Sequence, residues 1–282
     1  MTSERATDYG PILRVLGPAA AERWLARTRP AIALTADTDA HAHGPVVGQL
    51  HGLPSLPADV PWPVREGYGA LTHLATIDCA ALPVQKFDIG LPEDGTLLFF
   101  RWTFSDIDRY AEETGWTGDD SGCHQSRGTD RGAAMKLLHV PASVPTVTRL
   151  APEGSEVEVA TPMRLTTTYT SPLGWEETVR DFPIDDAHRT DLACAFDASV
   201  HTFGPHQVGG HPDGAGSSVV ESLARFVCGT DAPEEVLRAE DDRWVMIASI
   251  YDYMDEARTY WMIQREHLTQ GRFDDIYYEY QC

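Results

Sequence analysis

The chain has 282 residues, 42% of them apolar, which is enough to bury a large core as one domain or as two small ones. Asp and Glu number 43 against 22 Lys and Arg, and the resulting formal charge of −21 disfavours nucleic acid and anionic lipid as partners, since both are polyanions. A basic protein or a cation is compatible with this charge, and so is an acidic surface that only keeps the protein in solution.

The cysteines and the N-terminus indicate a cellular location. Five cysteines are scattered along the chain without a C-x-x-C pair, which is typical of thiols in a reducing compartment. The N-terminus has no apolar signal segment, and no run of about 18 apolar residues occurs. We therefore expect a cytoplasmic, unprocessed protein with no membrane partner.

The first predicted element is an N-terminal helix over 12–29. Apolar residues recur there at three- and four-residue steps, on one helix face. Gly17-Pro18 predicts a break or restart, because a proline in the first turn lacks only an N–H that has no partner there. We expect Pro30 to end the helix, before a short strand over 31–34.

Two similar glycine–proline corners follow, each leading into a pair of apolar segments. The corners are Gly52-Leu53-Pro54 and Gly210-His211-Pro212. The segments predicted to be strands are 71–77 and 96–102 after the first corner, and 244–250 and 258–263 after the second. This repetition predicts an internal duplication, with one half over about 31–150 and the other over about 151–282.

The remaining elements complete a single domain. Region 103–132 is rich in glycine and acids, so we expect an irregular excursion with one helix after Ser105. Ser218 and Gly229 bound a helical stripe over 219–228 through capping signals. Further strands are predicted at 135–140, 144–150, 156–159, 163–169 and 276–280, and further helices at 187–194, after Pro233 and from Arg265. No linker divides residues 1–282, so the prediction is one α+β domain of two related halves with antiparallel sheets and a few peripheral helices.

At these corners and strands the sequence resembles the DUF1963 or YwqG-like family of bacterial proteins. The matching segments are 51–57 (HGLPSLP), Trp62-Pro63, 74–77 (LATI), 91–100 (LPEDGTLLFF) and the corner at 210–212. The resemblance implies an α+β fold of two related halves around antiparallel sheet. Three positions depart from the family pattern: His51 replaces a glycine, and Thr76 and Ser249 stand where the family usually carries glutamine.

Histidines gather around both corners and suggest a metal site. His201, His206 and His211 are the candidate ligands near the second corner, and His51 lies at the first. If duplication brings the corners together, these imidazoles and nearby acids could converge on a divalent ion. Their spacing is not a recognised ligand pattern, so the alternative is a set of loop histidines, and no cofactor is predicted as required.

A second hypothesis is that the corners form a ligand-binding site without a metal. Its candidate residues are His51, His206, Gly209, Gly210, His211 and Asp213. The glycines precede the helix that starts after Ser218, whose N-terminal N–H groups could hold an anion, although the simpler reading is a turn and a cap.

No catalytic constellation emerges from the sequence. We therefore expect a non-catalytic binding protein, antitoxin-like or immunity-like, whose partner is a basic protein. The alternatives are a metal-dependent hydrolase that uses the corner histidines, or a small-metabolite-binding protein with its site at the junction of the halves.

Overall fold

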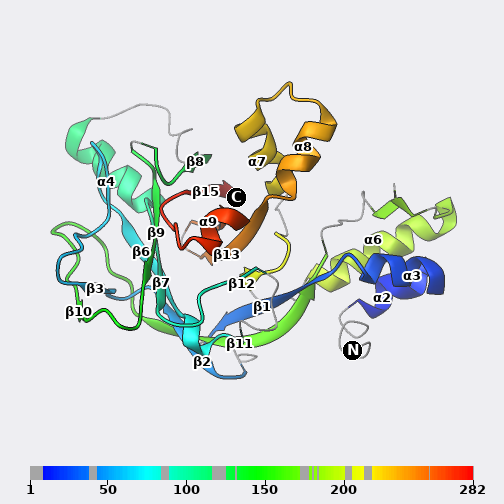
Figure 1. The fold of residues 1–282 in the computed structure, drawn as a ribbon, viewed down its shortest axis with the longest axis horizontal. Coiled ribbons are helices and arrows are strands. Elements are labelled where there is room, and N and C mark those ends of the chain that lie inside the picture. Colours follow the sequence, from blue (N-terminus) through cyan, green and yellow to red (C-terminus); the bar gives the residue numbers. More distant parts are fainter. Residues whose placement is uncertain are drawn as a thin grey trace.

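An eleven-stranded antiparallel sheet organises the computed structural model (Figure 1). The structure describes residues 9–37, 43–83, 89–115, 125–130, 132–171, 178–179, 181–182, 184–200, 205–212, 218–253 and 255–281. The strand order is β8-β15-β14-β13-β12-β1-β11-β2-β6-β7-β9, and seven α-helices lie within the described residues. The predicted α+β class with antiparallel sheet is confirmed.

The N-terminal helical segment forms a lobe with its own core. α2 (Gly10–Leu16) and α3 (Pro18–Leu25) are separate helices because Gly17 has φ 72° and Pro18 starts the second. With α6 (Asp186–Val200), they belong to the lobe at the right of Figure 1, in which Ile12, Trp24 and Leu192 are buried together.

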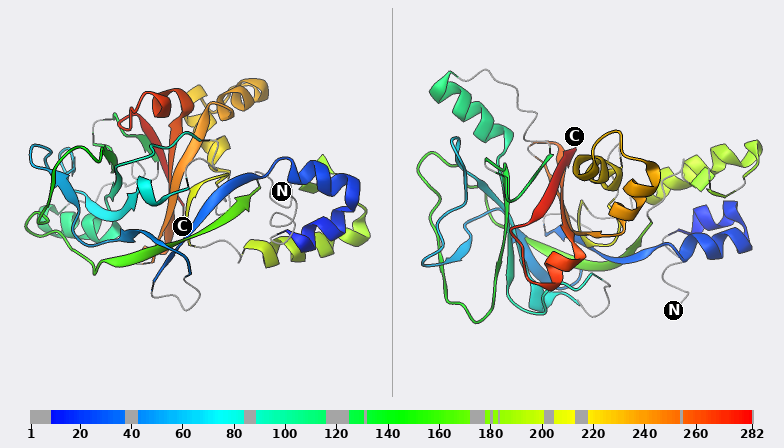
Figure 2. Two further views of the ribbon diagram at one scale, coloured as in Figure 1. Left: turned by 60° about the horizontal axis from the view of Figure 1, so that its bottom comes forward. Right: turned by 45° about the horizontal axis from the view of Figure 1, so that its top comes forward.

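The predicted helix over 12–29 is therefore wrong in extent. The Thr28 hydroxyl donates to the carbonyl of Leu25 and ends the second helix, while Pro30 lies inside a strand. That strand is β1 (Arg29–Ala36), which carries the chain from the lobe into the sheet (Figure 2).

Two long strands form the middle of the sheet. β1 pairs with β11 (Thr161–Thr170) from Arg29–Thr170 to Ala36–Met163. β12 (His206–Gly209) pairs with the free edge of β1, and β2 (Val46–Leu50) pairs with the free edge of β11. These two short strands are the ones that lead into the glycine–proline corners.

Three long strands continue the sheet on each side. Beyond β2 lie β6 (Thr72–Asp78), β7 (Thr96–Arg101) and β9 (Met135–Val140), and beyond β12 lie β13 (Trp244–Asp252), β14 (Ala257–Gln264) and β15 (Ile276–Gln281). The predicted strand pairs are thus confirmed. The β6–β7 register shifts between His73 and Ala75, and the β13–β14 register shifts between Met246 and Ala248.

The sheet curls until its two sides face each other, nearly closing into a barrel (Figure 2). The rings of Phe99 on β7 and Trp261 on β14 lie 5.0 Å apart, edge to face. The amide of Ala134, next to β9, donates to the hydroxyl of Tyr278 on β15 at 2.7 Å. One apolar cluster consequently contains buried residues from both sides of the sheet.

Helices and small sheets cover the outside. α7 (Val219–Cys228), followed by α8 (Glu234–Asp241), places Val219 and Leu223 against the outer face of β13, β14 and β15. The remaining elements are peripheral: α4 (Phe104–Thr114), α9 (Arg265–Thr269), the 3-10 turn η1 (Cys79–Ala81), the edge strand β8 (Gln125–Arg127) and the pairs β3 (Ser55–Pro57) with β10 (Thr146–Thr148) and β4 (Val64–Arg65) with β5 (Gly69–Ala70).

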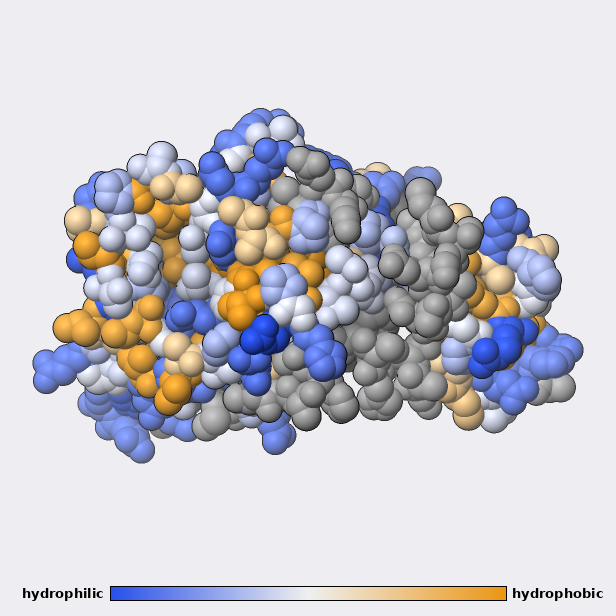
Figure 3. Space-filling model, turned by 90° about the horizontal axis from the view of Figure 1, so that it is seen from below, coloured by the Kyte–Doolittle hydropathy of each residue, from blue (hydrophilic) through white to orange (hydrophobic). Residues whose placement is uncertain are grey.

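Residues 151–160 correct one prediction. A strand was expected over 156–159, but this segment forms none, because Glu158 bonds through its carbonyl to Gly52 of the first corner instead of to a neighbouring strand. Exposed apolar side chains lie in this segment and just before it: Val157 and Val159, and Val147 and Leu150. Figure 3 shows apolar side chains gathered on the side of the molecule that carries β3 and β10.

No helix in the part of the chain that the structure describes is long and apolar enough to cross a membrane. Residues 1–8 and 116–124 are among those outside this part.

Candidate functional site

The two corners share one backbone geometry. His51 and Gly52 have φ of 53° and 71°, and Gly209 and Gly210 have φ of 66° and 73°. Each corner is braced by a glutamine from the strand before it, since Gln49 donates to the carbonyl of His51 at 2.9 Å and Gln207 donates to that of Gly209 at 2.7 Å. Left-handed φ values suit glycine, so His51 is held in a conformation that a side chain disfavours.

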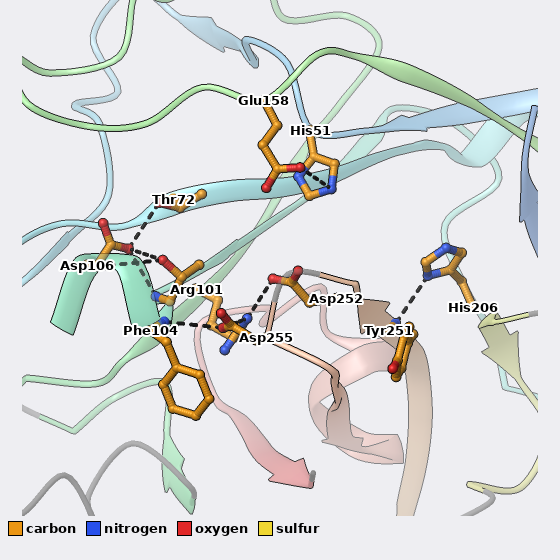
Figure 4. Close-up of polar contacts among 11 residues, drawn as sticks. His51, Thr72, Arg101, Phe104, Asp106, Glu158, His206, Tyr251, Asp252 and Asp255 are labelled. Carbon is orange, nitrogen blue, oxygen red and sulfur yellow. Dashed lines mark hydrogen bonds and ion pairs between the residues drawn. The ribbon is translucent and has the colours of Figure 1, made fainter. Parts of the chain in front are cut away.

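The first corner, residues 51–54, opens toward a carboxylate. His51 Nε2 lies 3.4 Å from the carboxylate of Glu158, whose side chain is 42% exposed. The amide of Gly52 donates to the carbonyl of Glu158 at 3.1 Å, so the two segments are fixed to each other. His51 and Glu158 therefore form a pair at the surface of the curled sheet (Figure 4).

The buried side chain of His73 holds the first corner in place through a hydrogen bond. Its Nδ1 contacts the carbonyl of Gly52 at 3.0 Å and its Nε2 contacts the Thr76 hydroxyl at 2.9 Å. Burial lowers the pKa of His73 to about 4, so the ring is neutral near pH 7 and both nitrogens are engaged. His73 therefore positions the backbone of the first corner.

The second corner, residues 209–212, is closed by packing. A Cβ at Gly210 would lie 2.7 Å from that of Ala31 and would also collide with the Thr170 hydroxyl. The amide of His211 bonds to the Thr170 hydroxyl at 2.6 Å, and its Nε2 lies 3.1 Å from the carbonyl of Arg27. The corner therefore faces the β1–β11 arm and not the interior of the curled sheet.

A buried charge cluster joins the two sides of the sheet. Arg101, at the end of β7, bonds to Asp252 at 2.7 Å and to Asp255, both from the β13–β14 hairpin. Asp255 also accepts the Phe104 amide at 3.2 Å, and the guanidinium lies over the Tyr280 ring. All three charged side chains are at most 4% exposed, so the cluster fastens the sides together (Figure 4).

His206 lies at the start of β12 and is completely buried. Its Nδ1 accepts the Tyr251 amide at 3.1 Å, while its Nε2 has no hydrogen-bond partner among the described residues. Burial, with smaller contributions from Arg258 and His51, lowers the pKa of His206 to about 3, and Asp252 opposes this shift. The Tyr253 ring lies 6.1 Å from the imidazole and its side chain is exposed at the surface.

These groups form one electrostatic unit, the junction site, defined here as His51, Glu158, Asp252, Asp255 and His206 with Arg101 between the aspartates. Burial raises the pKa of Glu158; His51 lowers it, whereas Asp252, Glu156 and Asp255 raise it further. Each side of the sheet contributes to the site. Carboxylates outnumber the guanidinium, so the site has a surplus of negative charge that only Glu158 presents to solvent.

The structure separates the predicted ligand residues. His51 and His206 act on each other electrostatically and belong to the junction site. Gly209, Gly210 and His211 shape and pack the second corner. Asp213 and His201 lie outside the described residues.

The two predicted metal ligands that the structure describes, His206 and His211, have different partners. His206 bonds to Tyr251, whereas His211 contacts Arg27 at the end of the helical lobe. Among the residues described, no three His, Cys, Asp or Glu side chains are grouped so that they could hold a metal ion.

The two positions that depart from the family's glutamines have local roles. Thr76 bonds to His73, and the Ser249 hydroxyl lies 3.4 Å from Arg258. Neither contributes a bond to the junction site.

Arg101, Asp252, Asp255 and Glu158 were missed by the sequence reasoning. Arg101 did carry a signal, because a charged residue directly after the apolar run 97–100 must be paired if the strand is buried. Its partners lie 151 and 154 residues away, so no local pattern could identify them.

A family model described as "Domain of unknown function (DUF1963)" matches residues 48–282. A search of curated proteins finds no match. The matched region contains both corners, the strands on each side of the sheet and the whole junction site, whereas α2, α3 and β1 precede it. The chain belongs to the DUF1963 family.

Proposed function

We propose that this chain is a non-catalytic, cytoplasmic binding protein that captures a cationic side chain of a basic protein partner at the junction site. One observation carries the proposal: Glu158 is a half-exposed carboxylate at the edge of a buried acidic cluster. This is the arrangement expected for recognition of an ammonium or guanidinium group.

The electrostatics favour a cation over an anion. The pKa of Glu158 is raised by burial and by Asp252, Glu156 and Asp255, so the carboxylate is destabilised in the free protein. A cation placed beside it relieves this repulsion. Arg101 does not supply the missing charge, because it is already bound by two aspartates.

The surroundings favour a protein over a small metabolite. Val157 and Val159 flank Glu158 in sequence and are 47% and 86% exposed, and Leu150 is 82% exposed. Exposed apolar side chains around a charged centre are typical of protein interfaces, in which an apolar contact surrounds a specific pair. The formal charge of −21 adds long-range attraction for a basic surface.

The two buried histidines His73 and His206 are poorly suited to acid–base catalysis. A general base works best with a pKa near the operating pH. Burial lowers the pKa values of His206 and His73 to about 3 and about 4. They therefore remain neutral hydrogen-bonding groups, which supports a binding role.

We also propose that the two sides of the sheet arose by duplication of one unit. The first four strands outward from β1 (β12, β13, β14, β15) and the four outward from β11 (β2, β6, β7, β9) both follow chain order, and β8 is added only beyond β15. Gln49 on β2 pairs with Thr76 on β6, and Gln207 on β12 pairs in the same way with Ser249 on β13. The register of each following hairpin shifts just before an alanine, Ala75 in one and Ala248 in the other. On this account the junction site lies where the two copies meet.

Calorimetric titration with three blocked tripeptides tests the proposed function. Glycine–arginine–glycine and glycine–lysine–glycine should bind, and glycine–citrulline–glycine should bind at least about tenfold more weakly, because citrulline keeps the shape of arginine without its charge. Binding should weaken with added salt, since Glu158 is exposed to the solvent.

A pair of variants localises the effect. Glu158→Gln should reduce arginine binding at least about tenfold, whereas Glu22→Gln on α3 removes the same charge from the helical lobe and should leave binding unchanged. Equal binding of the arginine and citrulline peptides, or equal effects of the two variants, contradicts the proposal.

A further inference from the structure

Residues 156–160 form an exposed segment that leads directly into β11. The chain makes no helix, turn or bend between residues 155 and 160, and no residue there has a positive φ. The backbone is therefore extended. Every residue from Glu156 to Ala160 is exposed, so this stretch of chain is accessible from outside.

The backbone of this segment is largely unpaired. Its amides donate no hydrogen bond to any residue within the described part of the chain, whereas the next residue, Thr161, is already paired with Leu50 of β2. The Glu158 carbonyl accepts the Gly52 amide at 3.1 Å and so points toward the first corner. Successive residues of an extended chain turn their backbone groups to opposite sides, so those of Val157 point away from the corner. The segment is thus an open edge to which a further strand can be added.

Acidic and apolar side chains alternate along this edge. Glu156 and Glu158 alternate with Val157 and Val159, and an extended chain turns successive side chains to opposite faces. Glu158 projects toward His51 (Figure 4) and is still 42% exposed. Val157 is 47% exposed and Val159 is 86% exposed. A strand added alongside would therefore place its side chains opposite a carboxylate and a valine in turn.

The charges determine what kind of strand fits this edge. Side chains directly opposite each other in neighbouring strands interact, and like charges in that position destabilise the pair. In any register, a second copy of this chain paired antiparallel through the same segment sets a glutamate against a glutamate or a valine, and neither compensates the charge. A strand with basic and apolar residues at alternate positions matches both the carboxylates and the valines.

We propose that residues 156–160 are the edge at which the partner adds a β-strand whose basic and apolar side chains alternate, with one basic side chain opposite Glu158. This inference rests on the proposed function, since the cation at Glu158 is the same, and it names the partner's contact as an extended segment. Main-chain hydrogen bonds to the edge add affinity that does not depend on charge, and the alternating side chains set the register.

Two blocked hexapeptides of equal composition and charge test the alternation. One has the order threonine–arginine–valine–arginine–valine–threonine, and the other has the order threonine–arginine–arginine–valine–valine–threonine. Calorimetric titration of the full chain should show that the alternating peptide binds at least about tenfold more tightly, a difference of about 1.4 kcal/mol. Attraction by charge alone predicts equal affinities.

N-methylation of the peptide backbone tests the strand pairing itself. Each methyl group removes one N–H without changing the charge, and alternate N–H groups of a strand point to opposite edges. The alternating peptide is therefore made in two further forms, methylated on both arginines or on both valines. One form should bind at least about tenfold more weakly than the parent peptide, and the other should bind about as tightly.

A pair of variants tests the edge from the side of the protein. Val157→Pro removes a backbone N–H, whereas Val157→Thr keeps that N–H and the branched shape of the side chain. The Val157 amide bonds to no described residue, so its loss should leave the fold intact. The proline variant should bind the alternating peptide at least about tenfold more weakly, and the threonine variant should bind it about as tightly as the unaltered protein does.

Amide hydrogen exchange of the unaltered protein gives a readout that needs no variant. The amides of residues 156–160 should exchange quickly in the free protein, because they are exposed and bond to no described residue. Saturation with the alternating peptide should slow exchange at alternate residues of the segment by at least about tenfold.

The outcomes that overturn the inference differ from the failure of the proposed function. Equal affinities of the two hexapeptides, or equal effects of the two methylated forms with unchanged amide exchange, refute the added strand and leave cation binding at Glu158 intact. A dimer in sedimentation experiments that Val157→Pro dissociates would assign the edge to a second copy instead. If neither the hexapeptides nor the blocked glycine–arginine–glycine tripeptide binds, the proposed function fails, and the inference with it.

Discussion

The two corners of this protein have the same backbone and different uses. Both turn through two residues of positive φ, and both are braced by a glutamine on the preceding strand. The second corner carries glycines packed against Ala31 and Thr170, whereas the first carries His51 facing an exposed carboxylate. A repeated backbone therefore supplies geometry, and the residue placed in it decides whether the corner packs or binds.

The difference also shows where strain is tolerated. Glycine adopts a left-handed φ without cost from a side chain, but His51 does not. Strained residues tend to persist where function requires them. The five predictions below test this comparison, from the largest expected effect to the smallest.

The largest effect should come from the cluster that holds the two sides of the sheet together. Arg101→Met removes the buried guanidinium that Asp252 and Asp255 share and should lower the free energy of unfolding by about 3–5 kcal/mol. Urea denaturation measures this. Arg27→Met breaks the exposed pair with Asp181 and should cost less than about 1 kcal/mol; equal losses would show that the cluster is not buried in solution.

Gly210→Ala should disrupt the closed corner by about 2–4 kcal/mol. The substitution places a side chain on a residue with left-handed φ, and the added Cβ collides with Ala31 and Thr170. Gly115→Ala is the matched control, because Gly115 at the end of α4 is left-handed with nearly the same φ but has no atom within 4 Å of the added Cβ, and it should cost only about 1–2 kcal/mol. Thermal and urea unfolding of both variants provide the measurement, and identical losses would refute the packing account.

Acid should destabilise the protein through the histidines that support the two corners. The folded-state pKa values of His73 and His206 are about 4 and about 3, below the ordinary value of 6.5. The unfolded chain therefore takes up protons first as pH falls below 6.5, and stability present above that pH is lost toward pH 3. Each histidine contributes a slope of at most about 1.4 kcal/mol per pH unit.

Unfolding curves between pH 7 and pH 4 measure this slope. His73→Gln should make the dependence shallower, and His188→Gln, at an exposed position, should leave it unchanged. A slope that is the same in all three proteins would mean that the His73 ring is not held neutral in the folded protein.

His51→Gly should separate stability from binding. Glycine relieves the left-handed strain at φ 53° and should raise the free energy of unfolding by about 0.5–1 kcal/mol, while arginine-peptide binding at Glu158 is weakened. Glu256→Gly, at φ 49° on an exposed turn, provides a benchmark for strain relief alone. A destabilised His51→Gly variant would contradict the claim that this corner carries strain.

The smallest expected effect is that of histidine substitutions on the metal content of the protein. His206 and His211 bond to different parts of the protein, so a His206→Ala and His211→Ala double variant should not change metal content. Elemental analysis of protein purified without chelator or histidine tag should give well below one equivalent of metal. A full equivalent that is lost in the double variant would establish the metal site instead.

Local patterns predicted much of this fold. The apolar runs predicted β7 and β13, and Ser218 and Gly229 gave the bounds of α7. The corners were found from their shared Gly-x-Pro pattern, and in both the glycine of that pattern, Gly52 or Gly210, has a positive φ. β2 and β12 were not predicted as strands, because they are five and four residues long and include a glutamine each.

The site was only half predictable. His51 and His206 were chosen because they lie near the corners, and both belong to the junction site. Arg101, Asp252 and Asp255 meet only because the sheet curls on itself. The side-chain contact between β7 and β13 across that interior depends on the order of all the strands between them. Such a contact has no signature in a single sequence.

Residue-by-residue NMR during titration with the blocked glycine–arginine–glycine tripeptide most directly tests which corner binds. We predict that the amide shifts centre on His51, Gly52 and Glu158 and that those of Gly209, Gly210 and His211 stay nearly unchanged. Shifts centred on the second corner, or spread evenly over the acidic surface, would contradict the account.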